Sequence, residues 1–440
     1  MLDAIRNAWR LPDLRRKILF TLLILIVYRI ASHIPVPGVN TQALNSLFNG
    51  GQNSTTGTGG LVNILDIFSG GALSQFSVVA MGVYPYITAS IIMQLLQPLL
   101  PALEALAKEG DAGRRKLNQY THWLTIPLAI LQGIGNASIM NQYGVLSFSP
   151  INMLQPLSPN FLPDWSLIIT LTGGTMFALW LGELISEQGI GSGVSIIIFG
   201  GIVSAIPQRI AQLASTNLGA LLLFLVITVL TIVMIVYIQE GQRRIPVQYG
   251  KRVRGMKMYG GGSTHIPLRV NSAGMIPLIF AISILIFPGL LGSYLTASGW
   301  GDWARSLGTG ISNFFNPTGL SYAVLYFLMV IAFTFFYTWI IFQQQNLSEV
   351  LQQQGGFIPG IRPGPQTTRY LNGVIMRITI IGAVVLGIVA ILPFLERTES
   401  ASQTLILTST GLLIVVGVVL DTMKQLEAQL LMRHYEGFIK

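Results

Sequence analysis

The chain has 440 residues, of which 51% are hydrophobic and only 10% are charged, and its formal net charge is +9. Soluble domains carry about 25% charged residues, so this composition excludes an ordinary water-soluble protein and predicts one embedded in lipid. The sequence has no cysteine, which excludes disulfides and thiolate metal sites, and its four histidines show no metal-ligand spacing.

Apolar segments long enough to cross a bilayer follow one another along the whole chain. A transmembrane helix needs about 20 mostly apolar residues. Arg29 interrupts the end of the first apolar run and further spans follow it, so we interpret this run as a retained span and not as a signal peptide. Ten spans are predicted, at 18–37, 76–97, 120–140, 165–184, 193–209, 217–238, 271–292, 320–342, 373–393 and 403–421.

Lysine and arginine gather on one side of this predicted stack. The two termini and the loops between spans 2 and 3, 6 and 7, and 8 and 9, together with Arg377 just inside span nine, hold 22 of the 26 Lys and Arg residues. The remaining four are Arg29, Arg209, Arg305 and Arg397. By the positive-inside rule both termini are cytoplasmic, which agrees with an even number of spans.

Two spans share a motif at corresponding positions. Span two contains GVYPYITASI (82–91) and span seven contains GMIPLIFAIS (274–283), so Gly82 matches Gly274 and Pro85 matches Pro277. Each is the second span of a five-span half, and an odd number of spans turns the second half over in the membrane. The repeat predicts two inverted halves, 1–210 and 211–440. An ordinary kinked helix has the same Gly-x-x-Pro pattern and stays an alternative.

The predicted spans carry almost no charge. A secondary transporter of a small solute buries an ionisable residue to couple an ion, whereas Glu183, Asp421 and Arg29 fall near span ends, where snorkelling costs little. Branched aliphatic side chains recur near the two motifs instead. A ring of them between the halves would stop ions by dewetting and yield to something larger. Aliphatic side chains that only face lipid or neighbouring helices are the alternative.

Two further segments stand out. NILDIFSGGALSQF (63–76) is too apolar for a loop and too short and broken to span; an external loop with one amphipathic turn is the simple interpretation. The loop 239–270 combines alternating residues in RIPVQYGKRV with a GGG turn, which predicts a cytosolic hairpin. Its basic residues would attract a polyanion such as ribosomal RNA, although positive-inside bias alone explains their sign. The loop 343–372 presents Arg362 between prolines and glycines.

Five stretches resemble the SecY/Sec61-alpha family, in the family's order and over essentially the whole chain. They are NILDIFSGGALSQFSVVAMGVYPYITASIIMQLL, KEGDAGRRKLNQYTHW, GIGSGVSIIIFGGI, VNSAGMIPLIFA and FIPGIRPGPQTTRYL. The resemblance implies an all-α polytopic membrane protein, with ten transmembrane helices in two inverted five-helix halves around a central pore, and no enzyme. It implies the central pore subunit of the bacterial Sec translocation channel, in the plasma membrane. Such a subunit passes unfolded secretory polypeptides across the membrane and releases transmembrane segments into lipid.

The resemblance also implies partners and site residues. The partners are SecE, SecG, the SecA ATPase, the ribosome and signal sequences, and no cofactor is expected. The segment 61–74 would be a plug under the pore, weakly helical because of Gly70 and Gly71. A lateral gate would lie between spans 2 and 3 and spans 7 and 8, with Thr88, Gln132 and Asn271 hydrogen-bonded across it. Amides that satisfy nearby backbone groups are the alternative.

The implied residues form three sets besides the gate. The pore ring is Val83, Ile87, Ile91, Val194, Ile198, Ile276, Ile279 and Ile414. The plug is Asn63, Ile64, Leu65, Asp66, Ile67, Phe68, Ser69, Gly70, Gly71, Ala72 and Leu73. The residues that bind SecA or the ribosome are Arg243, Arg244, Lys251, Arg252, Arg254, Lys257, Arg362 and Arg369. A small-solute transporter and a membrane scaffold are the rival functions. The first needs a buried coupling residue, and the second needs neither a repeated kinked helix nor a plug.

Overall fold

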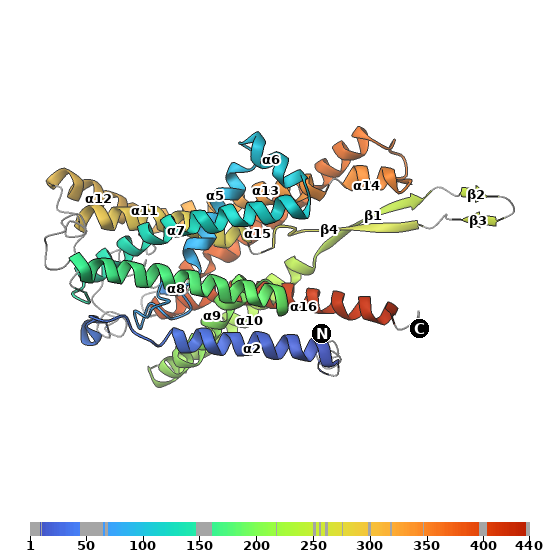
Figure 1. Cartoon of the computed structure of the whole chain (residues 1–440). Coiled ribbons are helices and arrows are strands. Elements are labelled where there is room, and N and C mark those ends of the chain that lie inside the picture. The colour runs from blue at the N-terminus through green and yellow to red at the C-terminus, as the bar shows by residue number, and fades with distance from the viewer. Residues whose placement is uncertain are drawn as a thin grey trace. The chain divides into compact units, whose positions relative to one another are not determined.

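Helices make up most of the protein (Figure 1). The computed structural model describes residues 9, 11–44, 65–66, 69–146, 161–216, 218–249, 252–254, 257–259, 263–274, 276–297, 301–316, 319–345, 347–395 and 403–436. Within them, ten helices overlap the ten predicted spans. They are α2 (Pro12–Ala31), α5 (Tyr84–Leu96), α7 (Asp111–Gln142), α8 (Phe161–Gln188), α9 (Gly193–Thr216), α10 (Leu218–Glu240), α11 (Ile276–Ala297), α13 (Leu320–Gln345), α15 (Pro365–Leu395) and α16 (Gln403–Glu436).

Length and hydropathy alone identify some of these helices as membrane spans. In the described part of the chain, α7, α8, α11, α13 and α15 each pass as candidates. α5 and the following α6 (Pro101–Lys108) pass together, but they are bent by 104°. The apolar described stretches of α9 and α10 are shorter, Gly193–Ser204 and Thr228–Glu240. The ten-span topology therefore rests on the family fold given below.

Span two begins later than predicted. α5 starts at Tyr84, and residues 78–83 form consecutive turns in place of the helix expected from residue 76. The backbone N–H groups of Ala80 and Gly82 donate to the carbonyls of Ser77 and Val79, which lie three residues earlier. Proline lacks an N–H and is favoured in the first turn of a helix, so Pro85 starts α5 and does not kink it.

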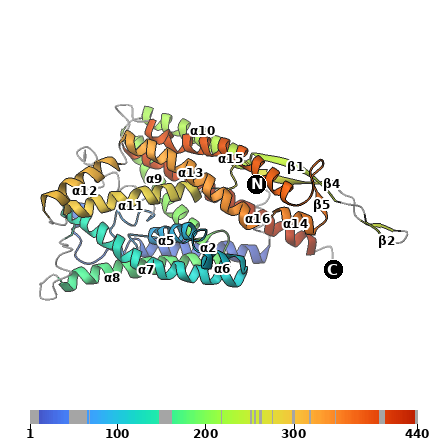
Figure 2. The ribbon, with the colours of Figure 1, turned by 90° about the horizontal axis from the view of Figure 1, so that it is seen from above.

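Contacts divide the chain into two compact units, each described by itself. The first comprises Met1–Thr228, Ile282–Val324 and Pro393–Lys440. In it α8 packs against α2, α7 and α9, and α5 packs against α7 (Figure 2). The turns before α5 lie against α8 at Gly174, where a methyl group would lie 1.9 Å from the Val78 carbonyl oxygen. Only glycine leaves room for this backbone.

The second unit comprises Val229–Ala281 and Leu325–Leu392. Its sheet has the order β4-β1-β5, with β1 (Gln242–Tyr249) antiparallel to both β4 (Ser263–Arg269) and β5 (Gly356–Phe357). Ile245 and Val247 on β1 are buried with Leu268 and with side chains of α15, whereas the alternate β1 residues are exposed. The sheet and the start of α15 thus share one apolar core.

The predicted hairpin is confirmed, but its turn was misplaced. β2 (Arg252–Arg254) pairs with β3 (Lys257–Tyr259), and the register Arg254↔Lys257 places the chain reversal between those two residues. The GGG stretch at 260–262 lies outside the described residues. Along the hairpin, β1 pairs with β4 and β2 pairs with β3 (Figures 1 and 2).

The predicted halves, 1–210 and 211–440, follow the repeat and not the packing. Both compact units include residues from each side of this boundary, because the units are defined by contacts and the halves by the sequence repeat. The halves stay a prediction.

Candidate functional site

The two repeated motifs adopt the same local conformation. Gly82 has φ +52° and Gly274 has φ +64°, both in the left-handed region that glycine enters without steric cost. The helix starts two residues later in each case, at Tyr84 and Ile276, and the next residue is proline. The motif is therefore a helix start and not a kink within a helix. The correspondence of sequence extends to backbone geometry.

The described part of the predicted plug is tightly packed. Leu65, Asp66 and Ser69 are buried, and Ala72 and Leu73 have exposed fractions of 0% and 1%. The backbone of this segment closes on itself: the Ser74 N–H donates to Asp66 Oδ1 at 2.8 Å, and the Leu73 N–H donates to Ser69 Oγ at 3.0 Å. Asn63, Ile64, Ile67 and Phe68 lie outside the described residues.

Two side chains of α2 hold the turn at the end of this segment. Tyr28 Oη donates to the Ser69 carbonyl at 2.8 Å, and Arg29 Nη1 donates to the Gly70 carbonyl at 3.0 Å. Arg29, which the sequence places near the end of a span, therefore has a partner within the protein. A guanidinium that meets a carbonyl inside the protein avoids the cost of an unpaired charge in lipid.

The glycine pair acts differently from the expectation. Gly70 has φ +71° and lies against Gly201 of α9, and a methyl group on Gly201 would lie 2.1 Å from Gly70 Cα. The pair was expected to loosen a helix. Instead, the lack of a Cβ on Gly70 and Gly201 lets two backbones touch, and this packs the turn closely.

The predicted ring residues are mostly buried. Val83, Ile91, Ile198 and Ile414 have exposed fractions of 0–1%, and Ile87 and Ile279 are also buried. Ile276 is exposed, and Val194 is half-buried, with Cγ2 near Gly182 of α8. Burial is compatible both with a ring and with helix packing. Ring membership stays a prediction.

The three predicted gate residues make one hydrogen bond between helices and two to nearby backbone carbonyls. Gln132 on α7 donates through Nε2 to Thr88 Oγ1 on α5 at 3.2 Å, and Thr88 donates to the Tyr84 carbonyl at 3.1 Å. Asn271 donates through Nδ2 to the Gly274 carbonyl at 2.8 Å. The amide of Asn271 thus satisfies a nearby backbone group, as in the alternative interpretation. It fixes the turn before α11.

One bond between α5 and α11 is not predicted from the sequence. The hydroxyl of Tyr84, which is 1% exposed, donates to the Ser283 carbonyl at 3.0 Å. A tyrosine inside an apolar span was the available signal, because a buried hydroxyl needs a partner. This bond joins the two repeated helices.

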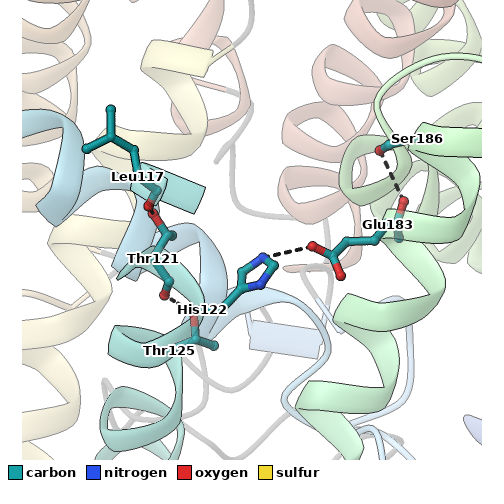
Figure 3. Close-up of polar contacts among 7 residues, drawn as sticks. Leu117, Thr121, His122, Thr125, Glu183 and Ser186 are labelled. Atoms are coloured by element: carbon teal, nitrogen blue, oxygen red, sulfur yellow. Dashed lines mark hydrogen bonds and ion pairs between the residues drawn. The ribbon is translucent and has the colours of Figure 1, made fainter. Parts of the chain in front are cut away.

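A polar pair lies between α7 and α8 (Figure 3). His122 Nε2 and Glu183 Oε1 are 2.9 Å apart, and the His122 ring also packs against Tyr86 at 5.8 Å between ring centroids. Glu183, which the sequence places near the end of span four, therefore has a partner within the protein. Its side chain is 46% exposed and that of His122 is 27% exposed, so the pair lacks the burial expected of an ion-coupling site.

The two predicted partner-binding loops belong to one body. β5 of the second loop pairs with β1 of the hairpin, and Ile358 and Leu371 share its core with Val247. Arg243, Arg244, Arg362 and Arg369 are exposed on this body. Arg252, Arg254 and Lys257 lie on β2 and β3, where only the backbone is described, and Lys251 lies outside the described residues. We name this sheet, with the start of α15, the basic body.

Comparison with known proteins gives the family. The SecY family model matches residues 77–423. The protein translocase subunit SecY of Streptomyces galbus is 41% identical over 453 residues, covering 100% of both chains. One similar solved structure is described by the statement that the plug domain of SecY stabilises the closed state of the translocation channel. Its TM-score is 0.60 and its sequence identity 19%, over 94% of this chain and 92% of that one. Sec61 in a canine ribosome-channel complex from the endoplasmic reticulum also gives 0.60, at 20% identity and the same coverage.

The fold is that of an all-α polytopic membrane protein with ten transmembrane helices. The chain belongs to the SecY family. Membership confirms the predicted fold class and the predicted kind of function, since the family consists of translocation channel subunits and not of enzymes.

Tyr84→Phe is expected to ease separation of α5 from α11. The substitution keeps the packing of the aromatic ring at position 84 and removes the hydroxyl that donates to the Ser283 carbonyl. Side-chain hydrogen bonds between membrane helices are worth about 0.6–1.7 kcal/mol, so the separated population should rise about 3- to 18-fold. Spin labels on cysteines at Leu99 and Leu291, which are both exposed, would report the distance distribution. Tyr86→Phe on the same helix is the control, and identical distributions for the two variants would contradict the role of this bond.

Proposed function

We propose that this chain is the pore subunit of a channel that passes unfolded secretory polypeptides across the plasma membrane and releases transmembrane segments sideways into lipid. The observation that carries the proposal is the family match over residues 77–423, which include every predicted ring and gate residue. A signal sequence, together with SecA or the ribosome, opens the channel. Both termini are cytoplasmic, as the distribution of Lys and Arg indicates.

The pore ring consists of the eight aliphatic residues predicted from the resemblance, contributed by two inverted halves, 1–210 and 211–440. The shared glycine geometry at the starts of α5 and α11 supports the repeat. Such a ring excludes water and ions when closed, and its flexible side chains yield around an extended polypeptide.

The plug, residues 61–74, closes the pore from the outer side. Its described part supports a defined closed position, held by bonds from Tyr28 and Arg29 and by the contact of Gly70 with Gly201. A neutral hydrogen bond contributes about 0.5–1.5 kcal/mol and one from a charged group about 1.5–3 kcal/mol. A difference of a few kcal/mol lets two positions interconvert when a polypeptide binds.

The lateral gate is the seam between α5 and α11, closed by the bond from Tyr84 to Ser283. Gln132 and Thr88 stiffen one side of it, and Asn271 shapes the turn on the other side. Single bonds of this strength suit a seam that opens when a signal sequence binds.

The partners follow from charge and from an apolar hollow. The exposed arginines of the basic body would bind ribosomal RNA phosphates or SecA. A hollow of about 270 Å³ between α2, α9 and α16, lined among others by Leu22, Phe199 and Val419, offers a place for an apolar helix of a small subunit such as SecE. SecG is expected on family grounds alone.

The ring is tested by a cross-link to a translocating chain. A cysteine at Ile279, in a protein that has no other, should form a disulfide with a cysteine in a secretory polypeptide arrested halfway through. Ile381→Cys, on the exposed side of α15, is the matched control and should not react. If arrested chains engage the protein but never link to position 279, the ring is only helix packing.

The plug is tested by the two adjacent glycines of α9. Gly201→Ala places a methyl group 2.1 Å from Gly70 Cα, whereas Gly200→Ala meets first the flexible end of Leu25, at 2.9 Å. Overpacking costs about 1–3 kcal/mol, so Gly201→Ala should raise the open fraction at least about 5-fold. Ion conductance in planar bilayers measures it, with deletion of 63–73 as the open reference. Equal conductance of both alanine variants would contradict the plug assignment.

The basic body is tested by reversing its charge. Arg243→Glu with Arg244→Glu should weaken ribosome binding and reduce the slope of log affinity against log salt by about one for each phosphate that the protein no longer neutralises. Both residues are exposed and outside the apolar core, so the fold should be kept. Arg305→Glu, on the predicted outer side, is the control. If the double variant binds ribosomes as tightly as the Arg305→Glu control, Arg243 and Arg244 do not contribute to ribosome binding.

A further inference from the structure

An amphipathic helix that the sequence analysis does not predict lies between α11 and α13. α12 (Asp302–Phe314) follows the end of α11 after only four residues, 298–301, and α13 begins at Leu320. α12 is therefore tied at both ends to helices of the membrane-spanning fold. It cannot lie far from the bilayer.

α12 runs back along the last turns of α11. A methyl group on Gly308 would lie 2.7 Å from the Gly292 carbonyl oxygen and 2.8 Å from the Thr296 nitrogen, and one on Gly292 would lie 3.0 Å from the Ser312 nitrogen. Later residues of α12 thus meet earlier residues of α11, so the helices are antiparallel. Glycine on both sides permits this close approach.

This packing sets the depth of α12. α11 has 22 residues and is about 33 Å long, close to the thickness of a hydrocarbon core. Gly292 lies five residues before the end of α11, about 7–8 Å below it. The part of α12 that packs on Gly292 therefore lies within about 8 Å of the end of α11, near the level where the hydrocarbon meets the head groups.

The exposed surface of α12 is divided into two stripes. At about 100° per residue, Asp302, Ser306, Thr309 and Asn313 fall on one side, and Trp303, Leu307 and Phe314 fall together about 100° away. The three large apolar side chains are 61%, 55% and 53% exposed. Between this stripe and the far edge of the polar stripe lie Ala304 and Gly308, which are buried. The apolar stripe is thus next to the flank of α11.

We propose that α12 lies in the lipid–water interface at the end of α11, with Trp303, Leu307 and Phe314 inserted among the lipids and its polar stripe facing water. A tryptophan at the edge of an apolar stripe is typical of interfacial segments, because the ring buries apolar area and its N–H stays hydrated. A large apolar stripe beside a strongly polar one is the pattern of interfacial helices. Its occupant is the protein's own bilayer, since the stripe continues the flank of a spanning helix. The proposal rests on the membrane fold and not on the proposed transport function.

Two pairs of adjacent residues test this assignment in the full chain, reconstituted into vesicles of phosphatidylethanolamine and phosphatidylglycerol. Single cysteines replace Leu307 or its polar neighbour Ser306, and Phe314 or its polar neighbour Asn313, and each carries a spin label. All four positions are exposed, so the substitutions leave the packing intact. The collision rate with oxygen, which enters lipid, is compared with that of a water-soluble nickel chelate.

The expected ratio of oxygen to nickel collisions is several-fold higher at 307 and 314 than at 306 and 313. If all four labels collide freely with nickel, α12 projects into water and the proposal is wrong. If the labels at 307 and 314 collide with neither oxygen nor the nickel chelate, another protein or a second copy covers the apolar stripe, and the proposal is also wrong. Translocation need not work for any of these outcomes to be measured.

Discussion

A lipid core offers no hydrogen-bond partner to a peptide group, and the architecture of the first unit depends on how that constraint is met. A chain that leaves the helix at membrane depth must be enclosed by protein or line a cavity. Residues 77–83 do leave it, and Ser77, Val79 and Val83 have exposed fractions of 0%. Their backbone hydrogen bonds close short turns. The strand-like pairing of residues 34–36 with residues 76–78 adds two more backbone hydrogen bonds. The non-helical segment is thus tolerated because residues 34–36 pair with it and α8 packs against it at Gly174.

Glycine makes that enclosure possible. The carbonyl of Val78 approaches α8 where Gly174 has no side chain, and the turn at Gly70 approaches α9 where Gly201 has none. Backbone segments that lie this close leave no space between them for lipid. Within the described residues, Phe76 is a non-glycine residue with φ +42°, and its full burial shows how firmly the surrounding contacts fix this strained backbone.

The sequence predicts the elements better than the contacts between them. The predicted apolar segments each overlap a helix, alternation predicts β1, and the repeat aligns Gly82 with Gly274, because each of these signals is local in the sequence. The bond from Tyr84 to Ser283 and the pair of His122 with Glu183 join residues far apart in sequence, and only the folded chain brings them together. The pairing of β5 with β1 is missed for the same reason: a two-residue strand has no period to detect. α12 is missed because its glycines and polar residues resemble a connector until α11 covers one face.

The polar contacts at the proposed plug and gate share a feature that suits a structure with two states. Tyr28, Arg29 and Tyr84 each donate to a backbone carbonyl and not to a carboxylate. A carbonyl has two lone pairs, and one inside a helix, such as that of Ser283, keeps its helical bond when the side chain leaves. Opening then costs about one hydrogen bond at Tyr28 and at Tyr84, whereas the guanidinium of Arg29 also needs a new partner. A buried ion pair in the same place would leave an uncompensated charge, at a cost of about 3–5 kcal/mol. Carbonyl acceptors therefore let the closed state be specific without making it too stable to open.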